Sequence, residues 1–175
     1  MHSISFFVEF SGCTGSQNQW NFKCDKAIDG IIHSGTGHTN FWSTPIPAWA
    51  IFELTEERNM NSLVLMSGVP YNRLLSFKVT LNVDGQWIQL SDLQVKDLLS
   101  DILVSTAQIE NDGTVTLNSG IDELTLEFTT VTNVQSIRLD VTETDHSLNN
   151  YLSLREIIPG FIGKLLHKLI FDIKD

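Results

Sequence analysis

Short apolar segments separated by tight turns constrain the fold of this chain more than any other feature. In 77–83 the apolar side chains occupy every second position, which is typical of a strand with one buried face. Asp84-Gly85 follows at once, and with the return segment 87–90 it predicts a β-hairpin. Further strands are predicted at 4–10, 49–54, 62–66, 115–117, 124–128, 137–141 and 151–157, with a polar loop at 12–18. The segment 93–103 is ambiguous, and a helical turn is one of its readings. Many short strands without intervening helices indicate an all-β antiparallel sandwich or jelly roll.

Length and charge narrow the functions of the chain. Its 175 residues fit one domain plus a short appendage. A net charge of −10 argues against nucleic acid, because neutralising phosphates requires clustered Lys and Arg. No apolar run approaches the roughly 20 residues that span a bilayer. The segment 1–10 lacks a basic leader, so we expect either a cytoplasmic protein or a module of a longer extracellular one.

Cys13 and Cys24 are the two cysteines of the chain. A bridge between them would close a short loop, whereas two reduced thiols would suit a cytoplasmic protein, and both readings stay open. Their spacing matches no zinc-binding pattern.

The C-terminal segment 159–175 differs from the rest. Pro159-Gly160 ends the last predicted strand, and apolar residues then recur at helical spacing: Ile162, Leu165, Leu166, Leu169 and Ile173. The sequence therefore predicts a sandwich over 1–158 and a short amphipathic helix over 159–175. Such a helix would bury its apolar face on its own sandwich, on a second subunit or partner, or on a membrane surface.

Several polar segments hold candidate binding residues. His33 and His38 flank Ser-Gly-Thr-Gly, where a neutral imidazole would bond a sugar hydroxyl or a metal, or simply face solvent. Trp20 lies in a polar stretch and is a candidate exposed platform, whereas Trp42, Trp49 and Trp87 are predicted to be core residues. The last polar loop holds His146, Asn149, Asn150 and Tyr151, and amides together with an aromatic ring suit sugar recognition.

Five motifs, taken in order, resemble those of discoidin domains, also called coagulation factor type C domains, which belong with the galactose-binding-like jelly rolls. The motifs are Ala27-Ile28-Asp29-Gly30, Phe41-Trp42-Ser43-Thr44, Trp49-Ala50-Ile51-Phe52-Glu53-Leu54, Asn72-Arg73-Leu74 followed by Asp84-Gly85-Gln86-Trp87, and Ser136-Ile137-Arg138-Leu139 followed by Leu152-Ser153-Leu154-Arg155-Glu156-Ile157. The resemblance covers 4–158 and implies a β-sandwich whose loops bind ligand at one end.

Members of this family bind sugars, as the family-32 carbohydrate-binding modules do, or phospholipids, or proteins. The sequence holds no hydrolase or phosphate-loop motif. We therefore expect a non-catalytic, lectin-like module for a glycan, with cell adhesion through several copies; a phospholipid-binding module and an intracellular protein–protein adaptor are the alternatives. The predicted ligand residues are Trp20, His33, His38, Asn72, Arg73, His146, Asn149 and Tyr151. For Arg73, the alternative is a structural role next to a core strand.

The resemblance also implies a structural calcium ion near the Asp29-Gly30 turn. Hard oxygen ligands brought together by a turn suit calcium. The matching candidates are the Lys26 carbonyl, Asp29, Thr39 or Asn40, and Glu156. The alternative to an ion site is that Asp29 caps its own turn and Glu156 faces water.

Overall fold

The structure, a computed structural model, describes residues 10–16, 23–30, 42–67, 72–145 and 151–160. These residues form eleven strands and one 3-10 helix, η1 (Cys24–Ala27). The strands are β1 (Phe10–Gly15), β2 (Trp42–Pro45), β3 (Ala48–Ser67), β4 (Leu74–Val83), β5 (Gln86–Gln89), β6 (Gln94–Asp97), β7 (Ile102–Leu103), β8 (Gln108–Ile109), β9 (Thr114–Thr116), β10 (Glu123–Thr144) and β11 (Tyr151–Gly160). Within these ranges no helix has the length and apolar character needed to cross a bilayer.

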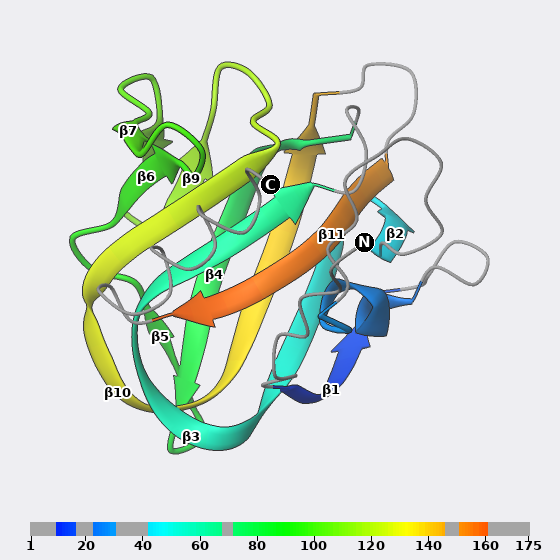
Figure 1. The fold of residues 1–175 in the computed structure, drawn as a ribbon, viewed down its shortest axis with the longest axis vertical. Helices are drawn as coiled ribbons and strands as arrows, with labels where there is room; N and C mark the ends of the chain where they lie inside the picture. Colours follow the sequence, from blue (N-terminus) through cyan, green and yellow to red (C-terminus); the bar gives the residue numbers. More distant parts are fainter. Residues whose placement is uncertain (1–9, 17–22, 31–41, 68–71, 146–150, 161–175) are drawn as a thin grey trace, which may run out of the picture.

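Two long, bent strands, β3 and β10, run through the whole sandwich (Figure 1). The sequence predicted each of them as two separate strands, because mostly polar residues interrupt the apolar alternation at 55–59 and 129–133. In the structure these residues continue the strands across the bend. The pairing of β3 with β10 is irregular only within the bend, between Glu127 and Ser136, and the same register holds on both sides of it: Leu126 lies opposite Leu63 and Leu139 lies opposite Ala50.

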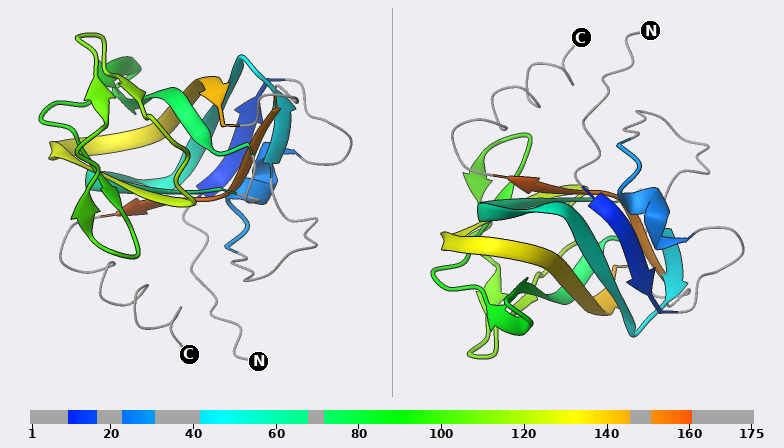
Figure 2. Two further views of the ribbon diagram at one scale, coloured as in Figure 1. Left: turned by 90° about the horizontal axis from the view of Figure 1, so that it is seen from above. Right: turned by 90° about the horizontal axis from the view of Figure 1, so that it is seen from below.

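The bend divides the strands into two sheets that pack face to face (Figure 2). The first sheet contains β2, β11, the second half of β3, the first half of β10, β6 and β7. The second sheet contains β1, the first half of β3, the second half of β10, β4, β5, β9 and β8. Neighbouring strands are antiparallel throughout, as the sequence predicted.

The core lies between the two sheets, and it confirms the predicted burial of Trp42, Phe77 and Leu139. The Trp42 and Phe52 rings meet edge to face at 6.3 Å. The core prediction is wrong for two other residues. Trp49 is half-buried on the outer face, since the alternation of β3 directs Phe52 inward, and Trp87 on the edge strand β5 is 42% exposed.

Local predictions had mixed outcomes. The Asp84-Gly85 hairpin is confirmed, with both residues at positive φ (51° and 79°). Of the two readings left open for Cys13 and Cys24, the structure has the disulfide bridge. The predicted loop at 12–18 is wrong at its start, because β1 pairs with β3 as far as Gly15. The ambiguous segment 93–103 forms β6 and β7, and the two strands are joined by one turn in which the Asp101 N–H donates to the Asp97 carbonyl at 2.9 Å.

The predicted strand at 4–10 lies outside the described residues except for Phe10, which begins β1. β11 extends through Gly160, two residues past the predicted end of the sandwich at 158. The predicted amphipathic helix of 159–175 otherwise lies outside the described residues, which contain no α-helix.

Candidate functional site

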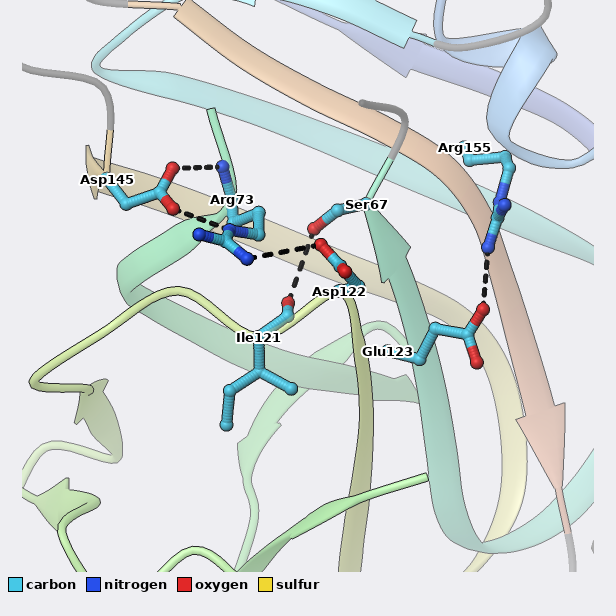
Figure 3. A network of polar contacts seen from close by, with 7 residues as sticks. All are labelled: Ser67, Arg73, Ile121, Asp122, Glu123, Asp145 and Arg155. Carbon is cyan, nitrogen blue, oxygen red and sulfur yellow. Dashed lines mark hydrogen bonds and ion pairs between the residues drawn. The ribbon is translucent and has the colours of Figure 1, made fainter. Parts of the chain in front are cut away.

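An arginine held by two carboxylates lies at one end of the sandwich (Figure 3). The Arg73 guanidinium pairs with Asp145 through Nε and with Asp122 through Nη1 at 3.4 Å. The Arg73 backbone N–H also donates to Asp145 Oδ1 at 2.8 Å, and the Asp145 N–H donates to the Arg73 carbonyl at 3.0 Å. These contacts join the start of β4 to the end of β10 and fix the guanidinium, whose side chain is 30% exposed.

The side chains of this network pack directly against the backbone of Gly120. A Cβ added at Gly120 would overlap the Asp145 carboxylate and would lie 2.7 Å from Arg73 Cβ. Only glycine therefore fits at position 120 without displacing the pair. Ser67 Oγ donates to the Ile121 carbonyl at 3.5 Å, and the Ser67 N–H donates to the Asp122 carbonyl at 2.7 Å, so the end of β3 is tied to the same loop.

Asn72, beside Arg73, faces inward. Its φ of 64° lies in the left-handed region, which Asn tolerates better than most residues. Its side-chain NH2 group donates to Ser153 Oγ at 3.4 Å, and its backbone carbonyl accepts from the Ser153 N–H at 3.4 Å. Asn72 Oδ1 is buried. Asn72 thus links the start of β4 to β11 at this end of the sandwich.

The structure brings three of the eight predicted ligand residues together. Arg73 and Asn72 lie beside the start of β11, where the Tyr151 carbonyl accepts from Thr144 Oγ1 at 3.1 Å and the ring is half-buried. The other five lie outside the described residues: Trp20, His33, His38, His146 and Asn149. The residues that flank the segments 68–71 and 146–150 are at this same end.

The sequence did not single out Asp122 and Asp145, which orient Arg73. Asp145 directly precedes the predicted polar loop, and an acid there was a usable signal that Arg73 has a partner. Asp122 lacks such a signal, because its role depends on the pairing of β10 with the end of β3.

A second site consists of two acids at the edge of the first sheet. η1 packs against β11, and Asp29-Gly30 follows η1. Glu156 on β11 is 4% exposed and accepts a hydrogen bond from the Gly30 N–H. Burial raises the pKa of Glu156 to about 9, and the negative charge of Asp29 raises it as well, while the Gly30 N–H and Arg155 act in the opposite direction.

The position of Glu156 contradicts the alternative in which this residue faces water. Glu156 Oε2 is buried and has no hydrogen-bond partner among the described residues. An oxygen of this kind next to a second carboxylate is a suitable ligand for a hard cation. Arg155, the neighbouring cation, pairs with Glu123 at 2.8 Å instead (Figure 3).

The remaining predicted ion ligands are less defined. Lys26 lies in η1, three residues before Asp29, and Thr39 and Asn40 lie outside the described residues. Across the described ranges no group of three or more His, Cys, Asp and Glu side chains is placed to hold a metal. A calcium site here therefore requires carbonyl or hydroxyl oxygens in addition to Asp29 and Glu156, which agrees with the candidate set.

No protein-family model and no curated protein matches the sequence. Solved structures do match its fold. A pectin-binding carbohydrate-binding module is 21% identical, with a TM-score of 0.62 over 91% of this chain and 96% of its own. Chitosan-binding module 2 of a chitosanase/glucanase from Paenibacillus sp. IK-5, in complex with chitotriose, is 14% identical, with a TM-score of 0.61 over 88% and 98%. The CBM32 of AlyQ, in complex with 4,5-unsaturated mannuronic acid, is 18% identical, with a TM-score of 0.57 over 87% and 96%.

Proposed function

We propose that this chain is a non-catalytic module that binds a glycan at the end of the sandwich where Arg73 lies. The observation that carries the proposal is the match of nearly the whole chain to the fold of modules that are named for a carbohydrate or are in complex with one. At identities of 21% and below this likeness establishes the fold and leaves the ligand to experiment. The jelly-roll fold is the one that the sequence resemblance implied.

Arg73 is the described residue best suited to contact a sugar at this end. Asp145 and Asp122 hold its guanidinium in one orientation while leaving the side chain partly exposed. A fixed group loses little conformational entropy when it donates hydrogen bonds to hydroxyls, and this favours binding. The aromatic ring of Tyr151 and the polar residues of 146–150 complete the proposed site, together with His33, His38 and Trp20. Asn72 supports the proposed site by linking the start of β4 to β11.

The Asp29–Glu156 pair is proposed as a structural calcium site. The ion would be held by Glu156, Asp29 and the Lys26 carbonyl, with Thr39 or Asn40. Bound calcium would offset the repulsion between the two carboxylates and fix the Asp29-Gly30 turn against β11. Because calcium binds only the folded arrangement, it would stabilise the protein by mass action.

A glycan array that includes pectin, chitotriose and uronic-acid oligosaccharides tests the proposal. We expect the wild-type protein to be retained by at least one glycan and Arg73→Gln to lose that retention. Lys96→Gln is the matched control, since Lys96 is also a partly buried cation (22% exposed) that is held by two carboxylates, Glu127 and Asp101. Equal loss in both variants, at unchanged melting temperatures, would contradict a role for Arg73.

A further inference from the structure

Trp87 is a large aromatic residue that the fold leaves exposed. It lies on the edge strand β5, all four residues of which are exposed, and the Trp87 residue retains 42% of its accessible surface. Tryptophan is enriched at binding surfaces, where its ring supplies a large apolar contact area and its N–H a hydrogen-bond donor. β5 pairs with the far end of β4, away from Arg73 (Figure 1).

The strand register defines what surrounds Trp87. Side chains of directly paired residues lie on the same face of a sheet, and every second residue of a strand shares that face. Trp87 lies opposite Asn82, which lies opposite Ser136; in the next row, Gln89 lies opposite Thr80, which lies opposite Arg138. Leu81, between these rows, points into the core. Ser136 is buried (5% exposed), so the other five residues form one accessible patch on the outer face of the second sheet: Trp87, Asn82, Gln89, Thr80 and Arg138. We call it the Trp87 patch.

Internal hydrogen bonds orient the polar groups of the Trp87 patch. Asn82 Oδ1 accepts from the Gly85 N–H at 3.1 Å, so the Asn82 NH2 group is left as a donor. The Gln89 NH2 group donates to the Asn111 carbonyl at 3.0 Å, so the Gln89 oxygen is left as an acceptor. A fixed donor and a fixed acceptor thus flank one exposed indole.

Arg138 forms the far side of the patch. Its Nε and Nη2 both donate to the Asp140 carboxylate at 2.8 Å, and its guanidinium carbon lies 5.4 Å from the centre of the Trp49 ring. This ion pair fixes the guanidinium and neutralises its charge. Lys78, which precedes Thr80 on the same face, is paired with Asp112 at 3.5 Å. The two cations beside the patch, Arg138 and Lys78, are therefore each paired with a carboxylate.

This chemistry selects an uncharged, hydroxyl-rich ligand. An indole stacks on the apolar face of a sugar ring, while oriented amides and a guanidinium exchange hydrogen bonds with its hydroxyls. The three strands give the patch a width of roughly 10 Å. An apolar protein surface would leave the amides without partners, which costs free energy, and an anionic glycan would meet only cations that are already paired with carboxylates.

We propose that the Trp87 patch is a second glycan site, which binds a neutral polysaccharide. The proposal goes beyond the function assigned to the Arg73 end. Arg73 and Asn82 are nine positions apart on an extended strand, or roughly 30 Å. A single sugar ring does not reach both sites, but a polysaccharide chain or two chains do. Two weak sites on one module raise the overall affinity for a polymer.

Affinity electrophoresis in gels that contain soluble β-glucan, mannan or xylan tests the second site. We expect at least one gel to retard the wild-type protein, and Trp87→Ala to weaken its affinity at least tenfold without changing the melting temperature. Leu103→Ala is the matched control, because it removes another exposed apolar side chain (Leu103, 52% exposed), on β7. Arg73→Gln reports separately on the first site.

Each outcome separates the two proposals. If Trp87→Ala migrates like the wild type in every gel, or if no gel retards the wild type, the second site is overturned; retention on the glycan array that depends on Arg73 would still support the first site. If Trp87→Ala alone loses retardation, the second site stands without the first. If Trp87→Ala instead changes the sedimentation coefficient and not the retardation, the patch is a contact between copies of this chain, and the glycan proposal for it is wrong.

Discussion

Glu156 on β11 accepts a hydrogen bond from the backbone N–H of Gly30, the residue after Asp29. This contact fastens the turn that follows η1 to the edge of the first sheet. It also brings two carboxyl groups near each other in a buried place, where burial raises the pKa of Glu156 to about 9. At neutral pH such a group binds either a proton or a cation, and the choice between them is measurable.

Calcium should raise the melting temperature, and more so at pH 8 than at pH 6. At lower pH the ion must displace the proton of Glu156, which weakens binding. A calcium concentration 100 times the dissociation constant would add about 2.7 kcal/mol to the free energy of unfolding. Thermal melts with calcium and with a chelator at both pH values measure the effect. Superimposable melts would show that Asp29 is a turn residue only.

Glu156→Gln should flatten the pH dependence of stability when a chelator is present. The native pKa of about 9 exceeds the ordinary value of 4.5, so between these values the native state keeps a proton that the unfolded state has lost. Stability from this group is therefore fully present below pH 4.5 and is lost as the pH rises toward 9, by at most about 1.4 kcal/mol per pH unit. Gln mimics the protonated form and lacks this loss. Urea denaturation from pH 5 to pH 9 gives the free energy of unfolding of the two proteins. If that free energy changes with pH in the same way in both, Glu156 does not have a raised pKa in the native state.

Reduction of the Cys13–Cys24 bond should destabilise the protein. The bond joins β1 to the start of η1 and closes a loop with a sequence separation of 11 residues. In the chain-entropy model a loop of this size contributes about 3 kcal/mol. The double variant with Ser at both positions should therefore unfold at a lower urea concentration, and it should bind calcium more weakly because η1 precedes Asp29. A midpoint equal to that of the oxidised wild type would count against a structural role.

Gly120→Ala should destabilise the Arg73 end, whereas Gly12→Ala should not. The Cβ at position 120 would overlap Asp145 and push it away from Arg73, but a Cβ at Gly12 meets nothing within 4 Å. We expect a cost of about 1–3 kcal/mol for Gly120→Ala and weaker glycan retention, both measured beside Gly12→Ala. If the two variants unfold and bind alike, the Arg73–Asp145 pair does not depend on this close approach.

The sequence alone predicted the strands whose alternation is unbroken. Phe77, Val79 and Leu81 point into the core as their spacing required. It did not predict that 49–54 and 62–66 form one strand, because the polar residues between them break the pattern although the backbone stays extended through the bend. Trp49 and Trp87 were misplaced for a related reason. Residue type favours burial of tryptophan, but strand register decides which face it occupies, and pairing partners distant in sequence set that register.

The sequence likewise predicted one part of the candidate sites and not the other. The Asp-Gly motif and the final strand were enough to pair Asp29 with Glu156, since both belong to motifs with a fixed order in the resembling family. The ion pairs of Arg73 with Asp122 and Asp145 and the arrangement around Trp87 were not predictable, because each depends on which strands lie side by side.

The most direct test of glycan binding is an equilibrium titration of the wild-type protein and Arg73→Gln with the glycan that the array retains most strongly, with and without calcium. We expect saturable binding by the wild type with a dissociation constant near 1 mM, which corresponds to about −4 kcal/mol. Arg73→Gln should bind at least tenfold more weakly at a temperature at which both proteins are folded. Absence of saturable binding by the wild type at millimolar glycan, with calcium present, would contradict the central claim.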